Sequence, residues 1–305
     1  QWDDLTTKMG YWVDLDAPYV TYENEYIESV WYLLKELYKK DLIYKGYTIQ
    51  PFSPAAGTGL SSHELNQPGT YKDVKDVSAV AQFKIKRNER SEFLFEGLDN
   101  EDVHCIAWTT TPWTLPSNTA LAVGKKISYV RVKTYNPYTK LKVNIILAKD
   151  LLGKWFKPEH EALDFDAFQE TDKDIPFRVE AEFKGEQLEL VDYEQLLPYV
   201  QPEEGEAFKV ILGDFVSTED GTGIVHIAPS FGADDKFVAN KYGIGSLTLV
   251  DRQGKFVDSV TDFAGRYVKD YKDQGADYQN VDVDISIKLK QENKAFNVQK
   301  YSHNY

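Results

Sequence analysis

The sequence predicts an α+β fold, in which a mixed, barrel-like β domain carries peripheral helices and follows a helical lead-in segment. Three observations lead to this prediction. One long segment near the N-terminus has helical periodicity, short alternating or continuously apolar segments dominate the middle of the chain, and only short helical segments separate them. The 305 residues suffice for roughly two domains, or for one domain with a large insertion.

Residues 1–71 are expected to form the lead-in, a helix followed by an irregular connector. Apolar side chains between residues 24 and 42 recur at the i, i+3, i+4 and i+7 spacing of one helix face. The connector over 46–69 is rich in proline and glycine, which interrupt regular structure. A domain boundary is therefore predicted near residue 72.

Residues 72–265 are expected to form the β domain and residues 266–305 a return segment. Strict alternation predicts a strand over 77–85. Further strands are predicted over 103–108, 119–123, 129–134, 141–147, 208–212, 224–228 and 247–250, and short helices over 150–156, 193–197 and 234–242. The segment 281–289 fits both a strand and a helix, because its apolar residues satisfy both periods.

Composition restricts the possible partners and location. The net charge of −14, from 35 basic and 49 acidic residues, argues against broad neutralisation of a nucleic-acid backbone, so any such contact is expected to be local. The single cysteine, Cys105, excludes an internal disulfide and favours a reducing, cytoplasmic location. No apolar run approaches the roughly 18 residues that cross a bilayer, so no membrane partner is expected. The chain begins at Gln1 and its only methionine is Met9, which indicates a piece of a longer protein.

Several motifs of known chemistry are absent from the sequence. There is no phosphate-binding Gly-x4-Gly-Lys-Ser/Thr loop and no Gly-x-Ser-x-Gly nucleophile elbow, and Gly221-Thr222-Gly223 lacks the third glycine of a dinucleotide site. His63-Glu64 and His160-Glu161 lack the second histidine of a zinc-binding helix, so no metal site is expected. Cys105 lies in an apolar strand and is interpreted as an inert buried thiol.

The first informative motif is Trp-Thr-Thr-Thr-Pro-Trp-Thr-Leu-Pro-Ser-Asn over residues 108–118, directly after a predicted buried strand. Pro112 and Pro116 remove backbone donors, so this loop leaves the sheet and gathers four threonine hydroxyls, a serine hydroxyl and the Asn118 amide. Such a neutral lining can orient a sugar, an ester carbonyl and a water. The residue types alone leave an alternative open, in which the hydroxyls only satisfy the backbone of the loop.

The second informative motif spans residues 220–235 and is predicted to form a turn, a strand, a second turn and a helix start. His226 shares a strand face with small or apolar residues, and this face is expected to border a pocket. Asp234 and Asp235 stand where the helix begins, so one can stabilise its positive end while the other binds a cation such as an α-ammonium. Alone, each feature is typical of a structural residue. Together with the threonine loop they predict a metal-free hydrolytic pocket for a small amino ester.

These two motifs resemble the editing domain inserted in class I aminoacyl-tRNA synthetases. The Thr-Thr-Thr-Pro-Trp-Thr-Leu-Pro sequence is similar to the isoleucine-specific members in particular, since those for valine and leucine usually have Arg-Pro after the threonines. The resemblance extends over essentially the whole chain, through the further segments 8–14, 46–51, 263–268 and 301–303. It favours a helix over 277–292. The chain departs from many bacterial members at Phe231, where they carry a second histidine.

The resemblance implies a role for each candidate residue. Asp235 would bind the α-ammonium of a misattached amino acid through a charge-assisted bond. The residues that would position the terminal ribose, the ester and the attacking water, and shape the side-chain pocket, are Thr109, Thr110, Thr111, Asn118 and His226. Further substrate contacts are expected from Trp108, Trp113, Thr114 and Asp234.

The resemblance also implies a substrate and partners. The expected reaction is hydrolysis of the ester of valine on tRNA(Ile), with the 3′ end of that tRNA and the remainder of the synthetase as partners. The His-Ile-Gly-His and Lys-Met-Ser-Lys-Ser signatures that bind ATP in the family are absent, so ATP and Mg²⁺ are expected only for the full-length enzyme, which would ligate isoleucine to tRNA(Ile). The alternative function is that of a non-catalytic module with a decayed pocket, which docks the tRNA 3′ end or a partner.

Overall fold

The computed structural model describes residues 1–46, 48–53, 56–269 and 279–304, and the chain divides into unit 1, Gln1–Thr48, and unit 2, Ile49–Tyr305. Unit 1 contains helices α1 (Trp2–Lys8) and α2 (Asn24–Lys39). The predicted helix over 24–42 is confirmed and ends three residues earlier than expected. Among the described residues, no helix is long and apolar enough to cross a bilayer.

Unit 2 begins with the predicted connector. Two very short strands, β1 (Phe52–Ser53) and β2 (Thr58–Gly59), pair antiparallel, and the one-turn helix α3 (Ser62–Leu65) follows. Helix α3 starts with a capping box, in which Ser61 and Glu64 satisfy each other's backbone N–H groups. Connector residues 47, 54 and 55 lie outside the described residues. The domain limits near 72 and 265 stay predictions, since the two units divide elsewhere.

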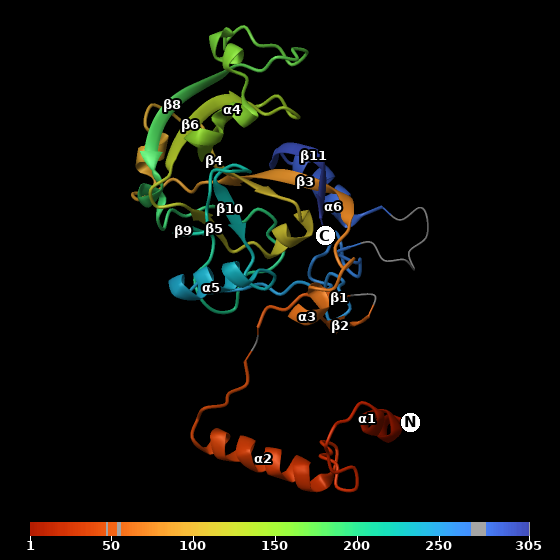
Figure 1. Ribbon diagram of the computed structural model, residues 1–305. Coiled ribbons are helices and arrows are strands. Elements are labelled where there is room, and N and C mark those ends of the chain that lie inside the picture. The colour runs from red at the N-terminus through yellow and green to blue at the C-terminus, as the bar shows by residue number, and fades with distance from the viewer. Residues whose placement is uncertain (47, 54–55, 270–278, 305) are drawn as a thin grey trace. The chain divides into compact units, whose positions relative to one another are not determined.

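A six-stranded sheet forms the larger layer of unit 2 (Figure 1). Its order is β11-β3-β4-β7-β6-β8, and all neighbours are antiparallel except β4 and β7. The strands are β3 (Asp73–Lys84), β4 (Val103–Thr109), β6 (Ser128–Tyr135), β7 (Lys142–Ala148), β8 (Phe177–Lys184) and β11 (Ala295–Asn304). The sequence predicted four of them and missed β8 and β11. Because β11 pairs with β3, the return segment becomes part of this sheet.

A three-stranded sheet in the order β10-β5-β9 forms the second layer. Its strands are β5 (Ala120–Val123), β9 (Lys209–Leu212) and β10 (Ile224–Ile227). The surrounding helices are α4 (Leu152–Trp155), α5 (Ala233–Tyr242) and α6 (Val281–Gln291), with 3₁₀ turns η1 (Glu92–Phe95), η2 (Pro112–Ser117), η3 (Lys149–Leu151), η4 (Pro158–Ala162) and η5 (Gly185–Leu188). The α+β class is confirmed. In the described part of the chain both sheets are open, so two open layers replace the expected barrel-like arrangement.

The short helix predicted over 193–197 is wrong. This segment is extended, because its backbone bonds to distant strands and not to itself. The Tyr193 N–H donates to the Phe208 carbonyl at 2.9 Å, and the Glu194 N–H donates to the Lys84 carbonyl at 2.7 Å. Tertiary pairing therefore overrides the local helical pattern at this point.

The structure also decides the ambiguous segment 281–289 and the predicted strand over 247–250. Residues 281–289 form helix α6, whose first turn is capped by the Asn280 side chain accepting from the Asp282 N–H at 2.8 Å. Residues 277 and 278 of the expected helix lie outside the described residues. The strand predicted over 247–250 is wrong, since only Val250 pairs there, in an isolated bridge to Phe256.

The buried phenol of Tyr129 ties the two layers together. Its hydroxyl accepts from the Gly124 N–H at 2.9 Å and donates to the Gly223 carbonyl at 2.7 Å, and its ring lies in the largest apolar cluster. Gly124 follows β5 and Gly223 precedes β10. One side chain of the large sheet therefore fixes two strand ends of the small one.

We expect Tyr129→Phe to lower the free energy of unfolding by about 1–3 kcal/mol, because both buried backbone groups lose their partner. Urea unfolding followed by circular dichroism measures this change. The exposed Tyr71 serves as the matched control, and Tyr71→Phe should leave the midpoint unchanged. Equal midpoints for the two variants would contradict this role of the Tyr129 hydroxyl.

Candidate active site

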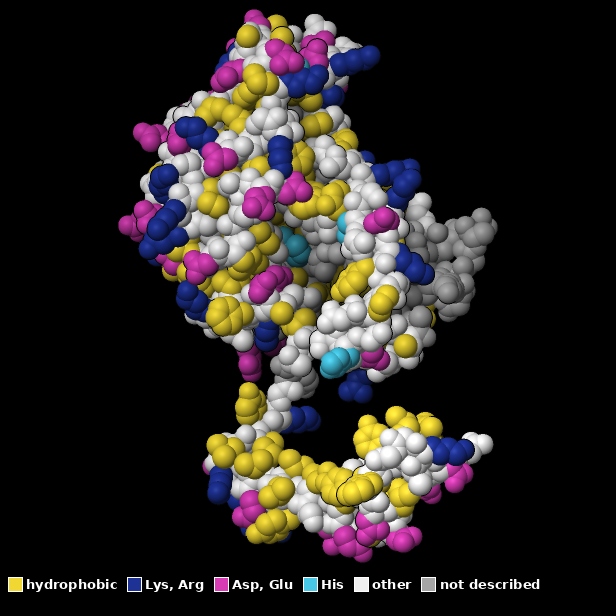
Figure 2. Space-filling model, viewed as in Figure 1, with side chains coloured by type: hydrophobic (Ala, Val, Ile, Leu, Met, Phe, Trp, Pro, Cys, Tyr) yellow, Lys and Arg dark blue, Asp and Glu magenta, His cyan; other side chains and the backbone are white. Residues whose placement is uncertain are grey.

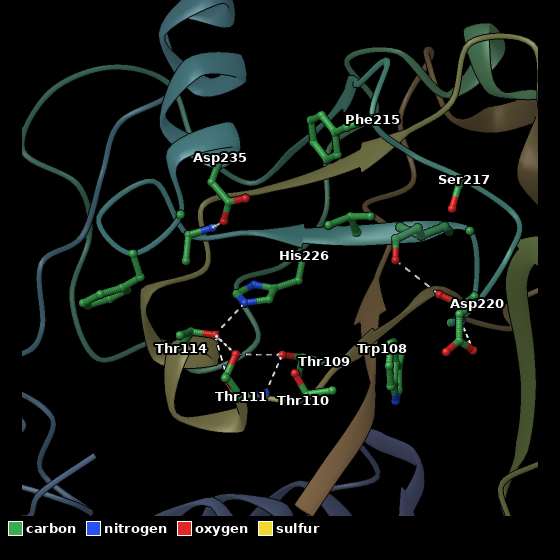
Figure 3. A pocket seen from close by; sticks show the side chains of 18 of the residues that line it. Trp108, Thr109, Thr110, Thr111, Thr114, Phe215, Ser217, Asp220, His226 and Asp235 are labelled. Carbon is green, nitrogen blue, oxygen red and sulfur yellow. Dashed lines mark hydrogen bonds between the residues drawn. The ribbon is translucent and has the colours of Figure 1, made fainter. Parts of the chain in front are cut away.

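A cavity of about 510 Å³ lies where the two predicted motifs meet (Figure 3). The threonine loop at the end of β4 contributes Trp108, Thr109, Thr110, Thr111 and Thr114. Strand β10, the turn after it and the start of α5 contribute His226, Ala228, Phe231, Gly232 and Asp235. The two stretches are more than a hundred residues apart in sequence, and the structure brings them to one shared space.

Three of the ten predicted site residues do not line this cavity. Asn118 is buried behind His226, and Asp234 is exposed on the first turn of α5. The ring of Trp113 packs edge-on against Phe231, with centroids 4.9 Å apart, so it supports the wall from behind. The other seven predicted residues lie together around the cavity.

His226 is held between the two motifs by both ring nitrogens. Its Nδ1 lies 3.1 Å from Asn118 Nδ2, and its Nε2 lies 2.8 Å from Thr114 Oγ1. Asn118 Nδ2 also donates to the Ala120 carbonyl at 2.8 Å, which fixes the orientation of the amide because a carbonyl only accepts. Nδ1 is therefore the acceptor, and the ring proton sits on Nε2 and points at Thr114 Oγ1. The Thr114 hydroxyl in turn donates to the Thr111 carbonyl at 2.8 Å.

This arrangement favours the neutral form of the His226 ring. Burial lowers its pKa to about 4, so the imidazole is uncharged at neutral pH. Its lone pair and its proton are both used by protein partners. A free general base would need an unoccupied nitrogen, and His226 does not offer one.

The threonines differ in what they can offer a ligand. Thr109 Oγ1 accepts from the Thr111 N–H at 3.1 Å and lies 3.3 Å from Thr111 Oγ1, while Thr114 is bonded to His226. The Thr110 hydroxyl makes no hydrogen bond within the described residues, and it faces the cavity. The alternative was that the hydroxyls only make hydrogen bonds within the protein. It fits Thr109, Thr111 and Thr114 but not Thr110.

Asp235 supplies the carboxylate on the other side of His226 from the threonines (Figure 3). Its Oδ2 accepts from the Ala228 N–H at 2.8 Å, which fixes one oxygen. Burial raises the pKa of Asp235, and the Ala228 N–H opposes that shift. A cationic ligand beside Asp235 would favour its charged form, so the site is suited to an ammonium group.

The sequence missed residues that complete the cavity and its support. Phe215 and Ser217 line it from the irregular loop between β9 and β10, for which no sequence pattern gave a signal. Tyr193 donates its hydroxyl to Asn118 Oδ1 at 2.6 Å, from the segment predicted as a helix. Gly223 has a positive φ of 74°, and a Cβ there would lie 2.3 Å from the Ala148 Cβ, so only glycine allows this close approach.

A metal site or a reactive cysteine among the described residues would offer a different chemistry. No group of three or more His, Cys, Asp and Glu side chains is placed to hold a metal ion within residues 1–46, 48–53, 56–269 and 279–304. Cys105 is buried, and burial raises its pKa to about 12, as expected for an inert thiol.

Residues 1–226 match the family model described as tRNA synthetases class I (I, L, M and V). The chain belongs to this family. The resemblance found in the threonine loop and the His226 segment is thereby confirmed at the level of the family.

The curated proteins with sequences similar to this chain include isoleucine–tRNA ligases. The isoleucine–tRNA ligase of Cytophaga hutchinsonii is 58% identical over 327 residues, which include all of this chain and 29% of that protein. The isoleucine–tRNA ligase of Bacteroides fragilis (strain ATCC 25285) is 52% identical over 333 residues, again with 100% of this chain and 29% of that protein. The chain thus spans less than a third of the length of these relatives.

Solved structures with a similar arrangement include two synthetase editing domains. The editing domain of the P. knowlesi cytosolic leucyl-tRNA synthetase has a TM-score of 0.49 and 11% identity, covering 75% of this chain and 97% of that one. The corresponding P. falciparum domain has a TM-score of 0.45 and 9% identity, covering 75% of this chain and 100% of that one.

The depressed pKa of His226 predicts a loss of stability in acid. The unfolded chain binds a proton near pH 6.5, whereas the folded chain binds it only near pH 4, so the stabilising contribution is present above pH 6.5 and disappears as the pH falls toward 4. Between pH 7 and pH 5 this loss is about 2 kcal/mol.

Urea unfolding at pH 7 and pH 5 tests this contribution. His226→Gln should show a smaller drop in stability between the two pH values than the unchanged protein, by about 2 kcal/mol. His63 is exposed, so His63→Gln should keep the original drop. If His226→Gln retained the full drop, His226 would not be held neutral.

Proposed function

We propose that this chain is the editing module of an isoleucine-specific synthetase and hydrolyses the ester of valine attached in error to tRNA(Ile). The observation that carries the proposal is the shared cavity, in which the Asp235 carboxylate faces neutral hydroxyls across a neutral histidine. The membership of the chain in the class I synthetases and its similarity to isoleucine–tRNA ligases support the same substrate class.

In this proposal Asp235 anchors the substrate. The α-ammonium of valine forms a charge-assisted hydrogen bond with the carboxylate oxygen that the Ala228 N–H leaves available. The ester then extends toward the threonine loop, where the Thr110 hydroxyl bonds the attacking water or the ribose. His226 fixes the position of Thr114 through their hydrogen bond, and its ring lines the cavity between Asp235 and the threonine loop.

Hydrolysis proceeds by positioning of water and not by a strong base. Water adds to the carbonyl carbon, the bond from that carbon to the ribose oxygen breaks, and the water proton passes to the ribose side, with help from the neighbouring ribose hydroxyl. The products are free valine and a tRNA with an intact 3′ end. Because both ring nitrogens of His226 are bonded to protein partners, we assign most of the rate enhancement to proximity and orientation.

A second, hydrolytic site is needed because a single binding site cannot distinguish valine from isoleucine strongly enough. One methylene changes binding by only about 1–3 kcal/mol, a limit for which isoleucyl-tRNA synthetase is the standard example. The editing cavity must therefore accept valine attached to the tRNA and exclude the larger isoleucine. Phe231, which packs on Trp113 and lines the cavity, is suited to that exclusion.

The partners and cofactors of the whole protein follow from the same proposal. On the face drawn in Figure 2, acidic and basic side chains of unit 2 are interspersed, which suits a module that receives only the 3′ end of tRNA(Ile). The rest of the synthetase would supply the main tRNA contacts and the ATP- and Mg²⁺-dependent ligation of isoleucine. We place the protein in the cytoplasm, as its single buried cysteine suggests.

Asp235→Asn tests the anchor in the full-length protein. The amide keeps an acceptor for the Ala228 N–H but removes the charge, so kcat/KM for deacylation of valyl-tRNA(Ile) should fall about 10- to 100-fold. Release of labelled valine gives the rate. The exposed Asp258 serves as the control, and Asp258→Asn should leave the rate unchanged.

The neighbouring aspartate and a substrate analogue separate the remaining possibilities. If Asp234→Asn lowers kcat/KM and Asp235→Asn does not, the ammonium binds Asp234 and the assignment is wrong. If the unchanged protein binds a non-hydrolysable valyl-adenosine analogue but never releases valine from the tRNA, the module is a docking domain and the proposed hydrolysis is wrong.

Thr110→Val tests the threonine hydroxyl of the loop that makes no hydrogen bond within the described residues. We expect kcat for deacylation to fall about tenfold while the melting temperature stays within a degree or two, because no internal hydrogen bond is lost. Thr109→Val, which removes the acceptor of the Thr111 N–H, should lower the melting temperature instead. An unchanged kcat in Thr110→Val would exclude Thr110 from the reaction.

A further inference from the structure

A buried carboxylate from the return segment reaches the threonine loop. Asp282, in the first turn of α6, has a side chain only 1% exposed, and its Oδ1 accepts from the Trp113 N–H at 2.7 Å. Trp113 is the second residue of η2, where a backbone N–H has no partner within the helix. Asp282 therefore caps η2 from a position 169 residues further along the chain.

The second oxygen of Asp282 is fixed from another direction. Its Oδ2 lies 2.9 Å from Lys269 Nζ, and Lys269 Nζ also lies 3.0 Å from Asp76 Oδ2 on strand β3. A carboxylate bonded through both oxygens cannot rotate away from the loop. The ion pair also compensates its buried charge, which otherwise would be costly.

The capped turn η2 carries one wall of the cavity. Thr111 precedes it, Thr114 within it bonds to His226, and the Trp113 ring packs on Phe231, which lines the cavity. A shift of η2 would therefore move the threonines and Phe231 relative to Asp235. Asp282 touches none of the space where the substrate would lie, so any effect on the reaction must pass through η2.

We propose that Asp282 is a positioning residue of the editing reaction, which holds η2 so that the threonine hydroxyls and Asp235 act on the same substrate. This inference rests on the proposed function. It assigns to the return segment, beyond the two motifs, a direct part in the geometry of the site.

Three variants of the full-length protein test this role. Asp282→Ala removes the acceptor of the Trp113 N–H, whereas Asp282→Asn retains one oxygen for it. Asp284 lies on the same helix and pairs with Arg266, away from η2, so Asp284→Asn is the matched control. Rates are compared below the melting temperature of every variant, so that only folded protein is measured.

We expect Asp282→Ala to lower kcat for deacylation of valyl-tRNA(Ile) about 10- to 100-fold, with a change in KM below threefold, because the Asp235 anchor remains. Asp282→Asn should restore kcat to within about threefold of the original, and Asp284→Asn should not change it. A purely structural role would lower the melting temperature and leave kcat unchanged in all three variants, and that result would overturn the inference.

Hydrogen exchange gives a readout that does not depend on activity. Amides of residues 110–118 should exchange faster in Asp282→Ala, but not in Asp282→Asn or Asp284→Asn. If the unchanged protein fails to deacylate valyl-tRNA(Ile), the proposed function falls, while the exchange pattern still decides whether Asp282 holds the loop. Identical exchange in Asp282→Ala and the unchanged protein would overturn the positioning role by itself.

Discussion

The pairing of His226 with Asn118 and Thr114 is the interaction on which the site depends. Through one ring it joins β10 to the middle of the threonine loop at Thr114 and to its end at Asn118, with distances of 2.8 and 3.1 Å. A buried imidazole is stable there only because each nitrogen has a partner of the opposite hydrogen-bonding type. The cost of that stability is that the ring has no unoccupied nitrogen with which to act as a base.

The division of charge in the cavity follows from the same constraint. Beside the neutral histidine and the threonine hydroxyls, the half-buried carboxylate of Asp235 is the group that we propose binds a cation. The other carboxylate important to the loop, Asp282, is enclosed and neutralised by Lys269, so its charge is not presented to a substrate. In our proposals, substrate anchoring and support of the threonine loop are thus assigned to two aspartates on two different helices, Asp235 on α5 and Asp282 on α6.

Much of the secondary structure could be predicted from the sequence because the apolar periods were strong. The continuous apolar runs gave β4, β5 and β7, and the alternation gave β3. Strand β8 also alternates, with Phe177, Val179, Ala181 and Phe183, so its period-two pattern was present in the sequence and was missed. Strand β11 is mostly polar and is a strand only because the edge of β3 accepts it, more than two hundred residues away.

The sequence by itself determined which groups we propose for the chemistry: a cluster of hydroxyls after a buried strand, one histidine in a strand and an aspartate pair at a helix start. This was possible because the residue types and the spacing of apolar residues within a short stretch of sequence are enough to recognise each of these features. Only the tertiary structure decided that Asp235 and not Asp234 faces the cavity, that Asn118 supports His226 from behind, and that Asp282 holds η2. Each of these depends on contacts between segments distant in the chain, and no local pattern records such contacts.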